Sequence, residues 1–299
     1  MDFVDMLLNR LDGELEPKVP AHALVCFSHP ETGRKLSQMV SEIILSKTEK
    51  SFITLLYFIP NTVGRSDDEP IEILQHKLLA DFKPKSEKSK ITMRLFIKES
   101  VDWVTEIRKM AEEQSCNLLF IGFDRNEITL GDAEKFIRLK NDQAITETAV
   151  LAQFGAQEAD RLKNISALLD RNRKVTSVFL DNGLLEISHV FIPVLSKADV
   201  HIFSFLYQAA LKEHVHVMVW DAVGILLSDP KMQKLYQHIV KKSDGRVQLW
   251  DANKKIEKDF MKTQDLLIIG IEGWSKLAAT PLYWKEALPS VLIIKDITN

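Results

Sequence analysis

The sequence predicts an α/β protein built from two tandem five-stranded, mainly parallel sheets flanked by helices. Two observations lead to this prediction. Short runs rich in β-branched residues alternate with stretches of helical periodicity, which is typical of βαβ units. The alternation then repeats in the second half of the 299-residue chain, whose length suits two domains better than one.

The first half begins with a strand at 23–27 and a helix whose first turn, Ser28–Glu31, contains a capping box and a proline. Apolar residues then recur at every third or fourth position through Ile44, as on one face of a helix. The same alternation continues to residue 181. It predicts further strands at 52–59, 91–97, 118–122 and 175–181, with helices at 71–82, 101–114 and around 162–169.

The second half repeats this series. Asn117–Gly122 has its counterpart in Asp265–Gly270, and Thr176–Phe179 has its counterpart in Pro289–Leu292. We therefore expect two units related by a pseudo-two-fold axis, because such a pairing would cover the edges of their fifth strands. The expected strands are 190–195, 215–220, 246–250, 266–271 and 290–294, and the expected helices are 199–212, 230–241 and 254–262.

The expected domain organisation has three parts: residues 1–20 as a linker or short helix, 21–183 as the first unit, and 187–299 as the second. The first unit is expected to carry an insertion at about 125–160, because the stretch between its fourth and fifth strands is far longer than 272–289 in the second unit. Residues 1–20 fit either the end of a linker or an N-terminal helix packed on the first unit.

Composition narrows the class of protein. Hydrophobic residues make up 45% and charged residues 27% of the chain, as in a protein with a full core, and the net charge of -3 provides no basic field for nucleic acid. Cys26 and Cys116 lie in or beside apolar runs, which indicates a reducing compartment rather than a disulfide framework. No apolar run is long enough to span a bilayer. We expect a cytoplasmic protein.

Several motifs resemble those of a known family. A glycine follows the fourth strand in both units, and the first unit opens with Ala21–Val25 and His29–Thr32 and closes with Ser177–Gly183. The second unit contains the pair Val190–Leu195 and Asp265–Gly273. Over nearly the whole chain, this pattern resembles tandem universal stress protein domains. More specifically, it resembles the cytosolic C-terminal region of bacterial cation:proton antiporters of the monovalent cation:proton antiporter-2 type.

The resemblance implies a non-catalytic regulatory function. In that family a membrane transporter domain precedes the tandem domains, which are thought to regulate it. The implied partner is therefore a transporter domain of the same or a neighbouring gene product. The chain would then lie at the cytosolic face of the inner membrane and sense a ligand or partner at the carboxyl ends of its strands. Two alternatives stay open: a free-standing tandem universal stress protein that binds a nucleotide, and a small-molecule hydrolase on the same sheet.

Many universal stress proteins bind ATP through a glycine-rich loop after the fourth strand, where backbone N–H groups reach phosphate oxygens. In the first unit the positions around this site are Ser28, His29, Gly122 and Asp124, and the loop lacks its second glycine. The carboxylate of Asp124 would also oppose a phosphate. The nucleotide site of the first unit is therefore predicted to be degenerate.

The second unit is the better candidate for ligand binding. Gly270, Gly273 and Ser275 match the start of the phosphate loop, and Ser196 follows the first strand of this unit. The indole of Trp274 could stack on a purine or fill the cleft. The distal glycine and hydroxyl residue of the motif are missing. We expect no cofactor, with ATP or AMP as the open alternative at this site.

No catalytic or metal-binding constellation is recognisable in the sequence. His214 and His216 alternate along one strand but lack a third ligand at the spacing that zinc requires, so no metal is expected. Gly273–Lys276 lacks the second glycine of a nucleophile elbow, and neither G-x-G-x-x-G nor a P-loop is present. We expect the chain not to be an enzyme.

One helical stretch, Val200–Tyr207, is apolar nearly all round. A helix of this kind is buried on more than one side. It is expected either to lie between the two units or to contact a second copy of the chain or the transporter domain.

Overall fold

The computed structural model describes Leu8, residues 21–45, 51–59, 71–82, 91–100, 102–124, Glu127, residues 174–280, Trp284 and residues 287–295. The predicted helix around 162–169 and, apart from Glu127, the predicted insertion at 125–160 lie outside these residues. Residues 1–20 are described only at Leu8, which is buried against the core.

The described strands are β1 (His22–Phe27), β2 (Ser51–Phe58), β3 (Ile91–Lys98), β4 (Leu118–Asp124), β5 (Val175–Asp181), β6 (His189–Val194), β7 (His216–Asp221), β8 (Val247–Leu249), β9 (Leu266–Gly270) and β10 (Ser290–Lys295). The helices are α2 (Pro30–Met39), η1 (Val40–Ile44), α3 (Ile71–Phe82), α4 (Trp103–Glu113), η2 (Lys197–Asp199), α8 (Ile202–Ala210), α9 (Ile225–Ser228), α10 (Pro230–Lys242), α11 (Lys258–Lys262) and α12 (Ile271–Ala279). Within the described part of the chain, none of these helices has the length and hydropathy needed to cross a bilayer.

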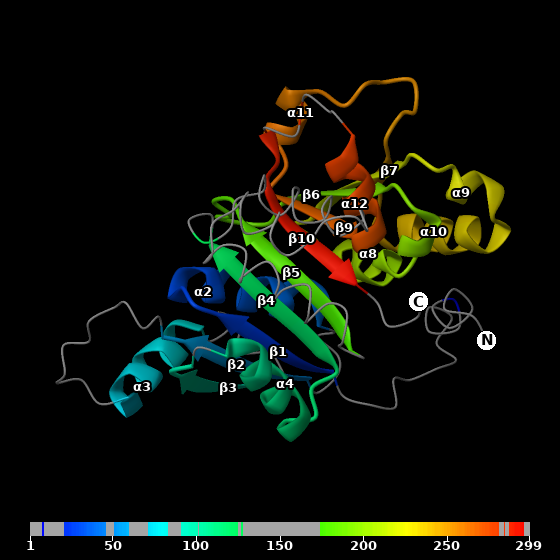
Figure 1. Cartoon of the computed structure of the whole chain (residues 1–299). Helices are drawn as coiled ribbons and strands as arrows, with labels where there is room; N and C mark the ends of the chain where they lie inside the picture. Colours follow the sequence, from blue (N-terminus) through cyan, green and yellow to red (C-terminus); the bar gives the residue numbers. More distant parts are fainter. Residues whose placement is uncertain are drawn as a thin grey trace, which may run out of the picture.

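The described strands form one continuous ten-stranded sheet in the order β3-β2-β1-β4-β5-β10-β9-β6-β7-β8, with β5 and β10 side by side at its centre (Figure 1). Strands β1–β5, here called the first half, have the order 3-2-1-4-5, and strands β6–β10, the second half, have the same order in reverse. Neighbouring strands are parallel within each half.

The two halves meet through an antiparallel pairing of β5 with β10, which runs from Leu180 opposite Val291 to Thr176 opposite Lys295. The expectation of two separate sheets is therefore wrong. Hydrogen bonding between the two fifth strands covers both of their edges directly, so one sheet results. An antiparallel central pair flanked by matching strand orders means that a pseudo-two-fold axis perpendicular to the sheet relates the two halves.

Helices cover both faces of the sheet, and the strands are apolar on both sides for this reason. In β1, Val25 and Phe27 pack with Leu36 of α2 on one face, whereas Leu24 and Cys26 pack on the opposite face. The first face also carries η1, α3, α8, α9 and α10, and the opposite face carries α4, α11 and α12. Because successive side chains alternate between faces, each strand reads as a continuous apolar run.

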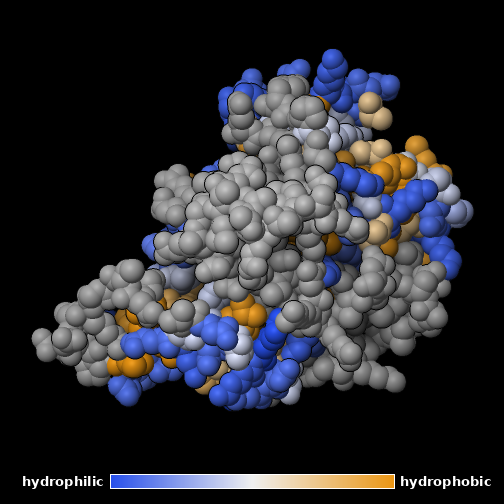
Figure 2. Space-filling model, in the orientation of Figure 1, coloured by the Kyte–Doolittle hydropathy of each residue, from blue (hydrophilic) through white to orange (hydrophobic). Residues whose placement is uncertain are grey.

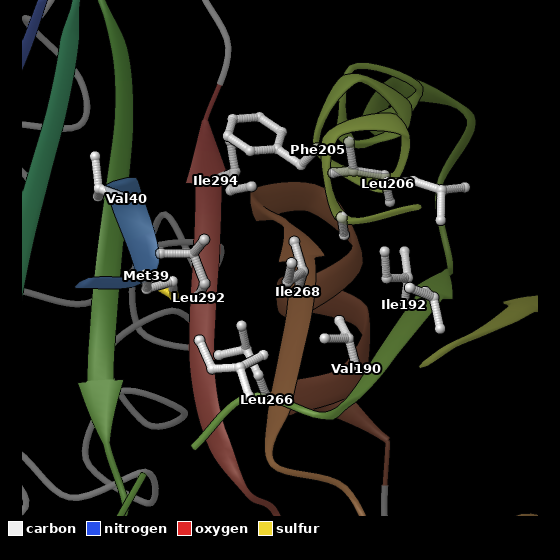
Figure 3. Packing of buried hydrophobic residues seen from close by; sticks show 14 of the residues in the cluster. Met39, Val40, Val190, Ile192, Phe205, Leu206, Leu266, Ile268, Leu292 and Ile294 are labelled. Carbon is white, nitrogen blue, oxygen red and sulfur yellow. The ribbon is translucent and has the colours of Figure 1, made fainter. Parts of the chain in front are cut away.

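The apolar helix α8 lies between the two halves. Its residues Ile202, Phe203 and Leu206 are fully buried, and the helix contacts η1 of the first half. Figure 3 shows Met39 and Val40 of the first half close to Leu292 of β10, with Phe205 and Leu206 of α8 beyond Ile294. Each fully buried side chain of this size contributes about 1.5–3 kcal/mol. Of the two expectations for Val200–Tyr207, burial between the units is confirmed.

Polar contacts fix one end of the seam between β5 and β10. The ammonium of Lys35 in α2 lies 2.9 Å from a carboxylate oxygen of Asp181, and the other oxygen accepts the backbone N–H groups of Gly183 and Leu184 at 3.0 Å. The N–H of Asn182 donates to the hydroxyl of Ser290 at 2.8 Å. These contacts tie the carboxyl end of β5 to the start of β10 and to α2.

Candidate functional site at the carboxyl ends of the strands

In an open parallel sheet, ligands bind beyond the carboxyl ends of the strands at the point where the strand order reverses. The structure has two such points, one between β1 and β4 and one between β6 and β9. The residues predicted from the sequence lie at these two points: Ser28, His29, Gly122 and Asp124 in the first half, and Ser196, Gly270, Gly273, Trp274 and Ser275 in the second.

In the second half, the side chain of Asp199 occupies the switch point. Asp199 ends the short helix η2. Ser196 caps the start of this helix, and its hydroxyl accepts the N–H of Ala198 at 3.3 Å. One oxygen of the Asp199 carboxylate accepts the N–H of Glu272 at 3.3 Å, and the other accepts the N–H of Gly273 at 2.5 Å. Asp199 therefore caps α12 from a distant part of the chain. Its carboxylate engages N–H groups of the first turn of this helix, which are the groups that could otherwise bind an anionic ligand.

The two glycines of the predicted loop make room for this carboxylate. A Cβ atom at Gly270 would lie 2.1 Å from Cγ of Asp199, and a Cβ atom at Gly273 would lie 2.7 Å from its Oδ2. Both distances are far below van der Waals contact. Glycine is therefore required at these positions for close approach of the Asp199 side chain, independently of any ligand.

Asp199 is 1% exposed, and burial raises the pKa of its carboxyl group above the ordinary value. The hydrogen bond from Gly273 and the nearby imidazole of His201 act in the opposite direction and favour the charged form. The ring of His201 is itself buried, with its Nε2 3.4 Å from the carbonyl oxygen of Ile294.

The segment expected to form a phosphate loop is the start of a helix. The helix α12 begins at Ile271, directly after β9, so Gly273 and Ser275 lie in its first two turns. Trp274 is 1% exposed and packs in the core, and among the described residues its Nε1 has no hydrogen-bond partner. Its indole is therefore not a stacking surface for a ligand in this structure. Ser275 is half-buried.

In the first half, the side chain of Glu127 occupies the corresponding position. Its carboxylate accepts the hydroxyl of Ser28, which follows β1, and also the N–H of Asp124 at the end of β4, at 2.9 Å. Glu127 thus joins the carboxyl ends of β1 and β4. His29 precedes α2, is exposed, and makes no capping hydrogen bond with its side chain.

Gly122 lies inside β4 rather than in a loop. A Cβ atom there would lie 3.0 Å from side-chain carbons of both Thr32 and Leu36, so this glycine permits close packing of α2 on the sheet. The hydroxyl of Thr32 is fully buried and has no hydrogen-bond partner among the described residues.

Three histidines of the second half, His189, His214 and His216, lie at the opposite, amino end of the strands. The ring of His216, in β7, stacks on that of His189 in β6 with centroids 5.8 Å apart, and His189 Nδ1 lies 3.7 Å from a carboxylate oxygen of Asp265. His214 is exposed in the preceding turn. Within the described ranges, no group of three or more potential metal ligands is assembled.

Sequence reasoning missed the two carboxylates that occupy the switch points. Asp199 follows Ser196 at the spacing of a local helix cap, and nothing in this pattern indicates a bond to α12, more than seventy residues later. Glu127 lies in the stretch predicted to be an insertion. In both cases the contact is long-range and becomes visible only in the folded chain.

Comparisons with known proteins place the chain in no family. No protein-family model matches the sequence, and no curated protein matches it significantly. One solved structure, the cytoplasmic domain of a prokaryotic cation chloride cotransporter, aligns over 93% of this chain and 96% of its own with 12% identity and a TM-score of 0.49. A functionally unknown protein from Pseudomonas aeruginosa PAO1 aligns over 97% and 95% with 12% identity and a TM-score of 0.44. Similarities of this size establish neither fold nor function.

Proposed function

We propose that this chain is a non-catalytic regulatory module of a cation/proton antiporter, acting at the cytosolic face of the membrane. Its partner is the transporter domain of the same or a neighbouring gene product. The link to an antiporter rests on the sequence resemblance, carried by motifs such as Ser177–Gly183 and Asp265–Gly273.

The non-catalytic part of the proposal is supported by one observation: the chain's own carboxylates occupy both switch points. Asp199 takes up the N–H groups of Glu272 and Gly273, and Glu127 takes up the N–H of Asp124 and the hydroxyl of Ser28. A phosphate placed there would meet a negative charge and would find these donors already engaged. Signals would then be received through protein contacts or through a ligand other than a nucleotide.

Calorimetric titration of the full chain with ATP and magnesium, and separately with AMP, tests the nucleotide alternative. We expect no saturable heat. Binding at micromolar affinity would instead favour a free-standing tandem universal stress protein, and binding that survives Gly273→Val would place the nucleotide away from α12.

A transport measurement tests the regulatory role itself. The codons for residues 21–295 are deleted in frame from the chromosomal gene, and everted membrane vesicles are assayed for sodium- or potassium-dependent dissipation of a proton gradient. We expect antiport to persist with an altered dependence on pH or cation concentration, and to be restored by supplying the chain in trans. Identical antiport curves with and without these residues would contradict the proposed function.

A further inference from the structure

The sheet ends in two edge strands of very different length. The strand β8 has three residues, whereas β3 has eight, and among the described strands each of them pairs on one side only. A long edge strand presents backbone N–H and C=O groups to which another chain can add a strand. The short β8 offers little room for such pairing, so β3 is the edge that requires protection.

Backbone hydrogen bonds show which residues of β3 face outward. The N–H of Ile59 donates to the carbonyl oxygen of Lys98 at 3.0 Å, so the backbone groups of Lys98 face β2. Successive residues of a strand turn their backbone groups to opposite sides, so Met93, Leu95 and Ile97 turn theirs to the free edge. Leu95 is the central one of these three residues.

The side chain of Gln75 closes this edge at its centre. Gln75 lies in α3, which packs against β3, and its Nε2 donates to the carbonyl oxygen of Leu95 at 2.5 Å. Figure 1 shows α3 beside β3 at the outer end of the sheet. The amide group of Gln75 therefore occupies the place that an N–H group of an added strand would take.

The sequence of β3 suits antiparallel pairing with itself. With Leu95 opposite Leu95 of a second copy, Met93 lies opposite Ile97, and these are the hydrogen-bonded pairs of the ladder. On the face that carries α4, Arg94 then lies opposite Phe96, where a cation and an aromatic ring attract each other. This register places no like charges opposite each other within β3.

Helix α3 adds exposed apolar surface next to this edge. Ile71 is 41% and Ile73 is 46% exposed, and Figure 2 shows hydrophobic residues over α3 at the lower left of the molecule. In α3 only Phe82 is buried, whereas α10, which lies between β7 and β8 in the chain as α3 lies between β2 and β3, buries three apolar side chains. Association of two copies at this edge would bring further apolar surface out of water.

We propose that Gln75 is a blocking contact that closes the β3 edge to strand addition by a second copy of this chain. The chain already uses this mode of association internally, because its two halves join through the antiparallel pair of β5 and β10. Pairing of two β3 strands around Leu95 would extend the sheet across a second two-fold axis. Loss of the Gln75 contact frees the central acceptor of that pairing and turns a monomer into a dimer.

Sedimentation equilibrium of the full chain tests the inference by comparing the wild type with Gln75→Ala. The matched control is Gln38→Ala, because Gln38 is also half-buried and donates to Glu42 at 3.2 Å, but lies in α2 over the interior of the sheet. We expect the wild type and the control to be monomeric. Gln75→Ala should dimerise roughly 10- to 100-fold more tightly, because each copy loses one competing hydrogen bond. Gln75→Glu keeps the length of the side chain but cannot donate at neutral pH, so it should dimerise as well.

A second change locates the interface. In the Gln75→Ala background, Met93→Pro removes an outward-facing N–H and places a ring at the free edge, while the hydrogen bonds of β3 to β2 remain. Dimerisation should disappear, and Ile97→Pro should have the same effect at the other end of the pairing. Circular dichroism checks that each variant is folded.

Three results would overturn the inference. The first is a folded Gln75→Ala chain that associates no more tightly than the wild type. The second is a Gln75→Ala dimer that persists with both proline substitutions, because the contact would then lie elsewhere. The third is a wild-type dimer that either proline substitution separates, because the edge would then be open with Gln75 in place.

Discussion

The two halves of the sheet share a strand order but differ at their switch points. In the first half β1 and β4 are paired up to Phe27 opposite Gly122, whereas in the second half β6 and β9 are paired only up to Phe191 opposite Leu267. The pairing in the second half stops before Pro193, which has no N–H to donate. Beyond this point the side chain of Asp199 lies against Gly270, the last residue of β9.

The carboxylate that occupies each switch point also comes from a different place. Glu127 follows the fourth strand of its half and reaches back to the first, whereas Asp199 follows the first strand of its half and reaches the helix after the fourth. The comparison shows that the fold fixes the position of the donors, and that a carboxylate from either neighbouring segment can satisfy them.

The largest effect is expected at the seam, where the two halves depend on each other. Replacing Lys35 with methionine leaves the carboxylate of Asp181, which is 4% exposed, without its cation. Removing one partner from a buried ion pair costs about 3–5 kcal/mol, so we expect a loss of roughly 3 kcal/mol in the free energy of unfolding, measured by urea denaturation.

The control for the seam is Lys98→Met, because Lys98 pairs with Glu106 at 3.5 Å with side chains that are 40% and 26% exposed. A pair this exposed contributes less than about 1 kcal/mol. If Lys35→Met costs no more than Lys98→Met, the polar contacts of Asp181 do not hold the halves together.

The two strand-end glycines provide the next comparison. Gly270→Ala places a methyl group within 2.1 Å of the Asp199 side chain, whereas Gly122→Ala meets methyl carbons of Leu36 and Thr32 at 3.0 Å. We expect losses of about 2–3 kcal/mol for Gly270→Ala and about 1 kcal/mol for Gly122→Ala in the same urea assay.

A double variant identifies the cause of the Gly270 effect. Because the Cβ atom of Asp199 would itself lie 2.5 Å from the new methyl group, the matched background is Asp199→Gly rather than Asp199→Ala. In that background Gly270→Ala should cost much less than in the wild type. An unchanged cost would show that the glycine is required for another reason.

Most of the sheet could be predicted from the sequence because its strands are buried on both faces. Runs such as Leu118–Gly122 and Leu266–Gly270 are recognisable from apolarity alone, and the repeat gave the matching elements of the two halves. The pairing of the two halves at their fifth strands was predicted from the repeat, but their joining into one continuous sheet was not, because it depends on contacts such as Asn182 with Ser290 between residues far apart in sequence. The division into units near residue 183 stays a prediction.

The candidate sites were harder to predict than the sheet. Gly270 and Gly273 have the composition of a loop, yet α12 begins between them because Asp199 supplies the cap that its first turn lacks locally. The sequence alone left two roles open for Trp274, stacking on a ligand or filling a cleft. The surrounding core decides between them, because it buries the indole. Local sequence patterns therefore identified residues at the switch points, but not the carboxylates of Asp199 and Glu127 that occupy them.

A smaller effect is expected when the two carboxylates themselves are removed. Asp199→Ala deletes the cap of α12 in a fully buried setting, which should cost about 1–2 kcal/mol. Glu127→Ala removes a half-buried carboxylate, and we expect a loss of less than about 1 kcal/mol. Equal losses would mean that the difference in burial between the two sites does not matter for stability.

The smallest expected effect is a pH dependence confined to the second half. Burial holds the pKa of Asp199 above its ordinary value of 3.8, so the folded chain takes up a proton at this site more readily than the unfolded chain. The stability contributed by this group therefore rises as the pH falls through its raised pKa and is complete below the ordinary value. Asp199→Asn has nearly the same volume and keeps one acceptor, but it does not titrate.

As the pH is lowered from neutral toward about 4, the wild type should therefore gain stability relative to Asp199→Asn. The measurement is the difference between their free energies of unfolding. Other carboxyl groups, such as Glu31 and Asp102 with their lowered pKa values, weaken both proteins alike in acid and cancel in the difference. The groups that face Asp199 are His201 from its own segment and Glu272 from α12. A Glu272→Gln background removes the second carboxylate, so the pH dependence should weaken but keep its sign. If the wild type instead loses stability relative to Asp199→Asn in acid, hydrogen bonding rather than burial dominates the pKa of this carboxyl group.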